Sequence, residues 1–337
     1  MKKKIFAALT LAFSTLALAS CGANQKLTFN PNWQNGIITE LETATSEQLS
    51  YAVTYNNANT FMQKEYYTVE YCGENNSNPG LYTTTLEYSK DEYTYKTKLE
   101  MTVVYTLANG TESATFNDVV ETEVVFKKTN SALRPVSSVK KVVSHTPRAV
   151  AATKLEDAYV TYNYEFRIDY KNDLSGGTLT TFDYSEPRTL LDKAKYPDGK
   201  TEDSFEIDGK KYTYLDNEQL LFAFRGLPTN TSGTKTVNVF HASLCQVEKA
   251  TIAVGETSKT KFSLNIDGVQ QEPEISYTSY TLKSGNKDAA TLQTLWYAKT
   301  TDRNNNTYRN VLLRMNVELF YGLGSYTYTL FKADFSK

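Results

Sequence analysis

The chain has 337 residues, 40% of them hydrophobic, with 25 tyrosines and 16 phenylalanines, so it is long and apolar enough to bury a sizeable core. Its 36 Lys and Arg residues against 38 Asp and Glu residues give a net charge of −2. Because phosphate binding needs clustered Lys and Arg, this balance argues against nucleic acid as a partner.

The first residues form an export signal. Residues 2–4 are lysines, and residues 5–18 are apolar apart from Thr10, Ser14 and Thr15. This stretch is shorter than the ~20 residues that a membrane-spanning helix needs, which favours a secretory signal over a permanent span. It ends in Leu18-Ala19-Ser20-Cys21, which resembles the lipobox of bacterial lipoproteins.

This resemblance implies that Cys21 is lipidated and becomes the first residue after cleavage. In bacterial lipoproteins the equivalent thiol receives a diacylglyceryl group, and the signal peptidase cuts before it. The protein is then exported and held to the bacterial membrane, facing the cell surface or the periplasm, because two acyl chains anchor a protein stably. The alternative is an ordinary secretory signal with an incidental cysteine. Cleavage leaves 33 basic against 38 acidic residues.

The next segment, residues 21–48, is interpreted as a tether and lead-in. Residues 25–35 are polar, which is typical of a flexible spacer. Residues 37–49 have scattered apolar positions, and they predict either a weak helix or an irregular lead-in.

From residue 49 to residue 337 the composition predicts an antiparallel β domain. Tyr, Phe, Thr and Val suit a pleated, half-buried surface. In residues 161–171 every second residue is apolar, namely Tyr162, Tyr164, Phe166, Ile168 and Tyr170. Such alternation indicates antiparallel strands with one face exposed to solvent.

Strand-like runs cover residues 65–71, 82–88, 92–107, 115–127, 136–145, 159–171, 177–184, 203–208, 210–215, 235–241, 246–254, 260–267, 272–282, 292–300, 307–317 and 325–334. Asn109-Gly110, Asp208-Gly209 and Asp267-Gly268 are typical of tight hairpin turns, and Gly176-Gly177 and Asp198-Gly199 mark further turns. The fold class predicted is mainly β: a large curved antiparallel meander sheet or open half-barrel with one or two short helices.

One helix is predicted after residue 216. Residues 216–219 cap and start it, Leu220, Leu221 and Phe224 give an apolar stripe, and Gly226 followed by Pro228 stops it. We expect it to lie on a sheet face or across an open end. Residues 289–297 are ambiguous between helix and strand.

Two features of chain organisation stay open at this stage. Residues 146–157, where Pro and Ala interrupt the strands, are either a domain boundary or a long connection, and a connection is favoured. Cys72 and Cys245 are either bridged or free, since export permits a disulfide but spacing does not reveal geometry.

No pattern of catalytic residues stands out, so we expect no enzyme, no cofactor and no metal. The two histidines, His145 and His241, lie in no recognised catalytic or zinc motif, and we interpret them as sheet residues. The pairs Glu121 with Glu123 and Glu272 with Glu274 each share a strand face, which is more typical of a solvated surface than of a glycosidase. Asp302, Asn304 and Asn306 lack the Gly and Glu of a calcium-binding loop.

The first hypothesis for function is an apolar-ligand carrier. A curved sheet with an apolar concave face and a helical lid resembles the half-barrel of LolA-like lipoprotein carriers. This resemblance implies a lipid or other apolar ligand, held by Leu220, Leu221 and Phe224 of the helix with Tyr162, Tyr164 and Phe166 of the sheet. The competing interpretation is that these residues fill a closed core.

The second hypothesis is a surface adhesin or carbohydrate-binding module that recognises a surface glycan. It needs exposed aromatic platforms, and the candidates are Trp33, Trp296 and the pair Tyr66-Tyr67. The competing interpretation is cross-strand packing within a tyrosine-rich sheet.

Overall fold

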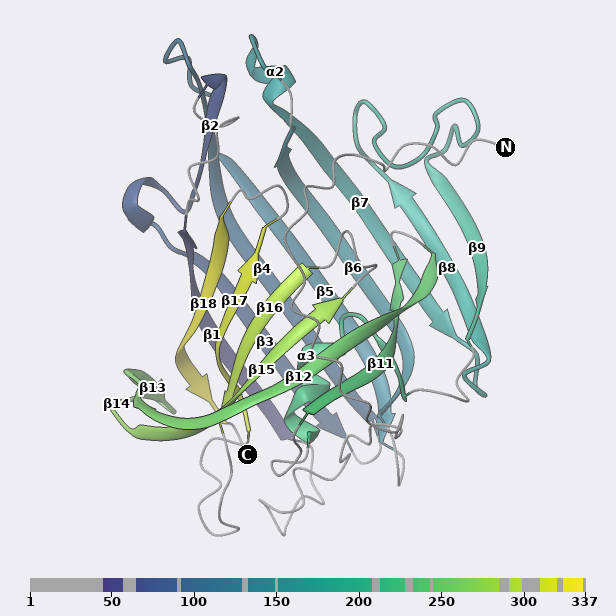
Figure 1. Ribbon diagram of the computed structural model, residues 1–337. Helices are drawn as coiled ribbons and strands as arrows, with labels where there is room; N and C mark the ends of the chain where they lie inside the picture. Colours follow the sequence, from purple (N-terminus) through teal and green to yellow (C-terminus); the bar gives the residue numbers. More distant parts are fainter. Residues whose placement is uncertain are drawn as a thin grey trace.

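The computed structural model describes residues 45–56, 65–89, 92–128, 133–148, 151–207, 213–227, 233–242, 245–284, 291–298, 310–319 and 324–335. These residues form one large β-sheet with a few short helical turns. The sheet has an N-terminal half and a C-terminal half, which face each other across the core (Figure 1).

The N-terminal half contains β1 (Thr45–Asn56), β2 (Tyr67–Tyr71), β3 (Gly80–Ser89), β4 (Glu92–Leu107), β5 (Phe116–Lys128), β6 (Leu133–Pro147), β7 (Tyr159–Tyr170), β8 (Gly176–Asp183) and β9 (Lys200–Glu206). From β3 to β9 each strand pairs antiparallel with the next, which makes a meander. β1 pairs with β3, and β2 runs along the end of β4 that β3 does not reach. Two short helices, η1 (Glu74–Asn76) and α2 (Leu155–Ala158), lie in the connections.

The C-terminal half contains β10 (Thr213–Asp216), β11 (Gly233–His241), β12 (Gln246–Lys261), β13 (Leu264–Ile266), β14 (Val269–Gln271), β15 (Glu274–Ser284), β16 (Thr291–Ala298), β17 (Leu312–Glu318) and β18 (Ser325–Asp334). The pairs β11–β12, β12–β15, β15–β16, β16–β17 and β17–β18 are antiparallel. β10 pairs with β11 in parallel, and the β13–β14 hairpin joins β18 in parallel. Between β10 and β11 lie α3 (Leu220–Ala223) and η2 (Phe224–Gly226).

The two halves join where β1 pairs with β18. The strand order is therefore β9-β8-β7-β6-β5-β4-β3-β1-β18-β17-β16-β15-β12-β11-β10. Within the described residues β9 and β10 do not pair with each other, so the sheet is not closed into a barrel. The prediction of a large, mainly antiparallel meander sheet is confirmed, with the two parallel pairings as an addition that the sequence did not predict.

Local chemistry explains most of the strand and turn positions. Asp267 and Gly268 have φ values of 48° and 86°, which is the backbone that a tight β13–β14 turn requires, so that turn is confirmed. Gly176-Gly177 is not a turn, because both residues lie in β8. A Cβ at Gly176 would lie 2.1 Å from the Phe205 carbonyl oxygen, so glycine there allows β9 to approach closely. Asp208-Gly209 lies outside the described residues.

Three sequence interpretations differ from the structure. β1 is a strand that the sequence pattern did not predict: it begins at Thr45 inside the predicted lead-in, while residues 37–44 lie outside the described part. The predicted strand 260–267 is divided between the end of β12 and β13. The ambiguous segment 289–297 forms β16 where it is described.

Residues 148–158 connect two neighbouring strands of the same sheet. β6 and β7 pair without interruption from Ser137 with Asp169 to Pro147 with Tyr159. The Ala- and Pro-containing stretch is therefore a connection at the end of a hairpin, with α2 inside it.

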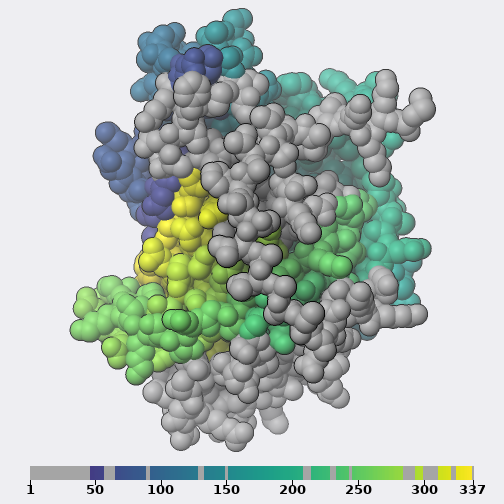
Figure 2. Space-filling view, in the orientation of Figure 1, coloured from purple at the N-terminus to yellow at the C-terminus, as the bar shows by residue number. Residues whose placement is uncertain are grey.

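The core has two parts. The main cluster lies between the two half-sheets and contains many buried tyrosines, among them Tyr51, Tyr93, Tyr105, Tyr280 and Tyr297. The smaller cluster lies between β7–β9 and β10–β11, and consists of Phe166, Ile168, Tyr170, Leu179, Phe205, Ile207, Tyr214 and Phe240. Among the coloured residues of the space-filling view, the yellow and green C-terminal ones lie on the near side, with purple, blue and teal N-terminal ones at the margins (Figure 2).

Candidate functional site

Most of the predicted apolar-ligand residues belong to the core or pack against it, whereas Tyr162 is half-buried beside Tyr164, with ring centroids 6.3 Å apart. Leu220 and Phe224 are 4% and 1% exposed, Leu221 is half-buried, and all three belong to the main cluster or pack against it. Phe166 is buried in the smaller cluster, and Tyr164 packs beside it with ring centroids 4.8 Å apart. The structure therefore assigns the helix residues and the β7 residues to different clusters.

The segment of residues 213–227, which we call the interior segment, contains β10, α3 and η2. Phe222 contacts the rings of Tyr93, Tyr95 and Phe126 in the N-terminal half-sheet, at centroid distances of 5.0 to 5.6 Å. Phe224 contacts Tyr280 and Tyr297 in the C-terminal half-sheet. The predicted helix is confirmed, and it packs on the inner faces of both half-sheets, which is the sheet-face alternative of the prediction (Figure 1).

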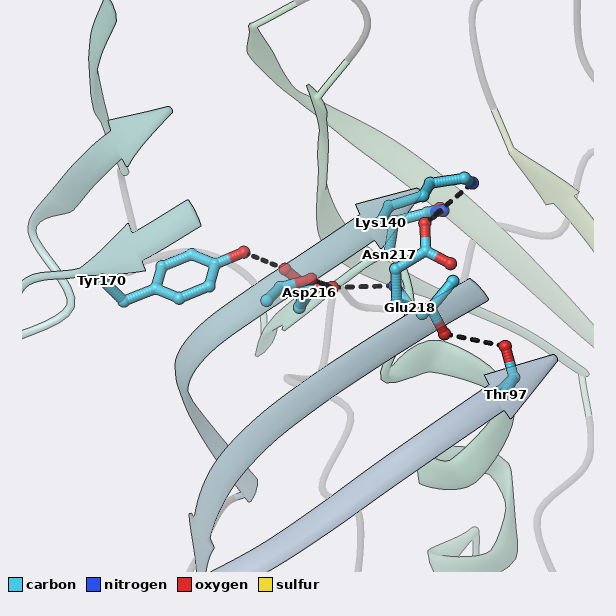
Figure 3. Close-up of polar contacts among 8 residues, drawn as sticks. Thr97, Lys140, Tyr170, Asp216, Asn217 and Glu218 are labelled. Atoms are coloured by element: carbon cyan, nitrogen blue, oxygen red, sulfur yellow. Dashed lines mark hydrogen bonds and ion pairs between the residues drawn. The ribbon is translucent and has the colours of Figure 1, made fainter. Parts of the chain in front are cut away.

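Asp216 fixes the start of the interior segment. Its fully buried carboxylate accepts hydrogen bonds from the hydroxyls of Tyr170 and Ser138 and from the backbone N–H of Glu218 (Figure 3). Burial raises the pKa of Asp216 to about 6, although these hydrogen bonds lower it. The side chain thus ties the turn before α3 to β6 and β7.

Beside Asp216, Lys140 of β6 forms an ion pair with Glu218, with 3.0 Å between Nζ and Oε1 (Figure 3). Burial acts to lower the pKa of Lys140, but the charge of Glu218, together with Tyr164 and Asp216, raises the pKa overall. Burial acts to raise the pKa of Glu218, but the Lys140 ammonium and a hydrogen bond from Asn217 together lower the pKa overall. Both groups are therefore charged at neutral pH, and each compensates the other.

The C-terminal end of the interior segment is bound to β1 and to residues of the C-terminal half. Arg225 forms a bidentate pair with Glu47 of β1, at 2.6 Å from Nη1 to Oε1 and 3.0 Å from Nη2 to Oε2. Both side chains are almost fully buried. Tyr297 donates from its hydroxyl to the Leu221 carbonyl at 2.6 Å, and Asn310 donates to the Arg225 carbonyl at 3.2 Å. The helix that the carrier hypothesis assigns to a ligand is thus packed against, and hydrogen-bonded to, the chain's own residues.

A separate groove lies on the other side of the N-terminal half-sheet, on the face that points away from the core; we call it the outer groove. Its volume is about 710 Å³. Residues of β1 and β3 to β7 line it, namely Gln48, Thr83, Thr85, Lys96, Thr97, Lys98, Glu121, Thr122, Glu123, Val139, Lys141, Glu165 and Arg167.

Strand register organises this lining into two rows that cross the sheet. The first row is Glu165, Lys141, Glu121, Lys98 and Thr83, each opposite the next on the neighbouring strand. The second row is Arg167, Val139, Glu123, Lys96, Thr85 and Gln48. Opposed residues on neighbouring strands share a face, so both rows lie on the face that points away from the core, where most of these side chains are exposed or half-exposed and Glu165 is 5% exposed.

The charges of the outer groove are partly paired within it. Lys96 lies 3.6 Å from Glu123, and Lys98 lies 3.6 Å from Glu121. These side chains are all close to half exposed, so the pairs contribute little to stability. Lys141 forms no ion pair with any residue in the described part of the chain.

An aromatic pair flanks the groove at its β7 end. Phe182 of β8 is opposite Glu165, and the Arg167 guanidinium lies 5.0 Å from its ring centroid. Tyr184 follows on the same face, stacked parallel to Phe182 at 6.0 Å and 50% exposed. Partial burial and the Glu165 carboxylate raise the pKa of the Tyr184 hydroxyl, while Arg167 lowers it.

The carboxylate pairs that the sequence singled out have different surroundings. Glu121 and Glu123 share the outer face as predicted, and both line the groove. Glu272 lies just before β15, Glu274 is its first residue, and both are exposed. Lys96 and Lys98 of β4 form a similar pair of charged residues at i and i+2. The sequence shows each pair separately, but only the register of six strands joins the pairs into one surface.

The histidines are half-buried sheet residues. His145 lies 2.8 Å from an oxygen of Asp118 and stacks on Phe116 with centroids 3.9 Å apart. His241 lies 3.8 Å from Glu248, and burial lowers its pKa despite that carboxylate. In the described part of the chain no three His, Cys, Asp or Glu side chains gather as metal ligands would.

The predicted aromatic platforms are mostly packed. Trp296 is half-buried with the Arg314 guanidinium 5.4 Å from its ring centroid, and Tyr67 is 3% exposed. Tyr66 is half-buried beside the core. Trp33, Cys21, Asp302, Asn304 and Asn306 lie outside the described residues.

Cys72 and Cys245 are free thiols, with Cys72 buried and Cys245 half-buried. No helix within the described ranges combines the length and the apolar character needed to cross a bilayer.

Comparisons with known proteins give a structural likeness only. No protein-family model matches the chain, and no curated protein matches it. Among solved structures it is similar to a beta-barrel-like protein of Domain of Unknown Function DUF1849 from Brucella abortus, at 12% identity and a TM-score of 0.48. That match covers 87% of this chain and 98% of the other chain. Any functional proposal therefore has to come from the residues of this chain.

Proposed function

We propose that this chain is an exported, lipid-anchored, non-catalytic binding protein that holds a polar ligand in its outer groove. The observation that carries the proposal is the groove itself, about 710 Å³ in volume and lined by two solvent-facing rows of charged and hydroxyl side chains. Ligands bind preferentially in concave sites, where convergent polar groups fix their orientation.

The interior of the sheet is a weaker candidate for a ligand site. An apolar ligand there would have to displace Phe222 and Phe224, which are each 1% exposed, and break the buried Arg225–Glu47 pair. Removing one partner of such a pair leaves an uncompensated buried charge, which is strongly unfavourable. We therefore assign the ligand to the outer face, in line with the surface-binding hypothesis rather than the carrier hypothesis.

The anchoring part of the proposal is supported by residues 2–21, where a basic start, an apolar stretch and the Leu18-Ala19-Ser20-Cys21 run occur in the order of a lipoprotein signal. Changing Cys21→Ala should leave an uncleaved or freely secreted chain, since no acyl group can be attached. Membrane fractionation and the mass of the processed N-terminus would measure this. A Cys21→Ala chain that is processed and still partitions with membranes would contradict lipid anchoring.

The ligand site is tested with the detergent-solubilised mature protein. Arrays of oligosaccharides and of mixed-charge peptides are probed with the wild type and with the double variant Lys98→Glu, Lys141→Glu. We expect a ligand from one array to lose binding at least tenfold in the double variant, because two donors become acceptors with a like charge beside Glu121.

The matched control is Lys154→Glu, because Lys154 is 71% exposed and lies outside the groove. It should bind as the wild type does. If every ligand bound the Lys98→Glu, Lys141→Glu double variant as tightly as it binds Lys154→Glu, that result would contradict a site in the outer groove.

A further inference from the structure

We infer that the ligand of the outer groove is a glycan: an extended, hydroxyl-rich chain with little net charge, one end of which stacks on Tyr184. This inference rests on the proposed function of the groove and names the class of its ligand. Four properties of the groove lead to it.

The first property is the charge balance. The groove contains four cationic side chains, Lys96, Lys98, Lys141 and Arg167, and three carboxylates, Glu121, Glu123 and Glu165. A polyanion or a polycation would meet like charges on every second strand, because the signs alternate along the first row. A chain with little net charge meets no such repulsion.

The second property is the alternation of donors and acceptors. In the first row Lys141 donates, Glu121 accepts and Lys98 donates, on strands ~4.8 Å apart, while Glu165 at the β7 end is buried and accepts from the Arg167 guanidinium. A sugar hydroxyl both donates and accepts, so successive hydroxyl groups match either type of side chain.

The third property separates a glycan from a peptide. A peptide that adds to a sheet uses free backbone groups at an edge strand. The strands that line the groove are flanked on both sides by paired neighbours, from β18 beyond β1 to β8 beyond β7. The groove therefore offers side chains alone, which suits a ligand that carries its hydrogen-bonding groups on its surface.

The fourth property is the shape of the site. From β7 to β1 the rows cross five strand-to-strand intervals, which is ~24 Å and calls for an extended ligand. At the β7 end Tyr184 offers a half-exposed ring, held by stacking on Phe182. An aromatic face of this kind packs against the flat apolar face of a sugar ring.

The test uses the detergent-solubilised mature protein and an array of linear oligosaccharides, both neutral and uronic-acid-containing, beside the peptide array. The best oligosaccharide is then titrated by calorimetry into the wild type, Tyr184→Ala and Tyr184→Phe. We expect Tyr184→Ala to weaken binding about five- to tenfold and Tyr184→Phe to bind as the wild type does, because Phe keeps the ring. Val269→Ala, an exposed apolar change on β14, is the control and should have no effect.

The outcomes separate the two proposals. If only peptides bind, and Lys98→Glu with Lys141→Glu abolishes that binding, the glycan inference is overturned and the groove function stands. If binding of an oligosaccharide requires Lys98 and Lys141 but is equally tight for Tyr184→Ala and the wild type, the stacking of a sugar ring on Tyr184 is overturned. If neither array yields a ligand that depends on the lysines, both the inference and the proposed function fail.

Discussion

At the scale of single residues, the buried charges define how the interior segment is held. Asp216 and Glu218 bind β6 and β7 at one end of the segment, and Arg225 binds Glu47 of β1 at the other. Each charge has a partner or several hydrogen bonds, as buried charges require. The segment is therefore positioned by polar contacts and packed by apolar ones.

Asp216 makes the stability of the protein depend on pH. Its pKa is raised to about 6 in the folded chain, from an ordinary value of 3.8, chiefly by burial. Protonation therefore favours the folded state, so this contribution is complete below about pH 4 and is lost as the pH rises through 6. The variant Asp216→Asn should lack this dependence.

We expect the unfolding free energy of the wild type to fall by about 1–2 kcal/mol between pH 5 and pH 8 relative to Asp216→Asn. Urea denaturation at both pH values measures the difference, with the exposed-carboxylate variant Glu272→Gln as control. Equal pH dependence of wild type and Asp216→Asn would show that the carboxylate titrates normally.

At the scale of elements, the short α3–η2 turn contributes more to the stability of the fold than its length suggests. Phe222 is 1% exposed and contacts three aromatic rings of β4 and β5. Four helical residues have little stability of their own, so the packing of these side chains, rather than helix propensity, stabilises the element.

Phe222→Ala should therefore destabilise the protein by about 3–5 kcal/mol, the usual effect of removing a fully buried phenylalanine. Val269→Ala, at a position 60% exposed, should change stability by less than ~0.5 kcal/mol. Chemical denaturation of both variants tests this. A loss below ~1 kcal/mol for Phe222→Ala would mean that the interior segment packs more loosely than its burial indicates.

At the scale of the whole molecule, one continuous sheet encloses its own aromatic core and presents a polar groove on the opposite face. Neither the main cluster nor the smaller cluster needs a ligand to fill it, since the interior segment packs against both half-sheets. This arrangement predicts that the folded protein carries no lipid inside.

Native and denaturing mass spectra of the mature protein from cells test that prediction. Acyl groups attached covalently persist in both spectra, whereas a lipid held in the interior adds mass only in the native one. We expect no such difference, because the interior segment occupies the space. An added native mass equal to that of a lipid would instead support the apolar-carrier hypothesis.

Local pattern alone predicted most of the strands and the helix of this protein, and the export signal that it also predicts stays a prediction. Period-two alternation needs only neighbouring residues, and even the missed β1 carries it in Leu49, Tyr51, Val53 and Tyr55. The chemistry of a cap, a turn or a strand is set within a few residues, so it can be predicted before the fold is known.

The tertiary structure alone decided where the helix lies and that a groove exists. The β1–β18 pairing joins residues such as Val53 and Tyr328 that are far apart in sequence, and the parallel β10–β11 pairing carries α3 into the core. The two rows of the groove arise only when six strands are in register, since a shift of one residue would turn these side chains to the other face. Register depends on long-range pairing, which no local periodicity specifies.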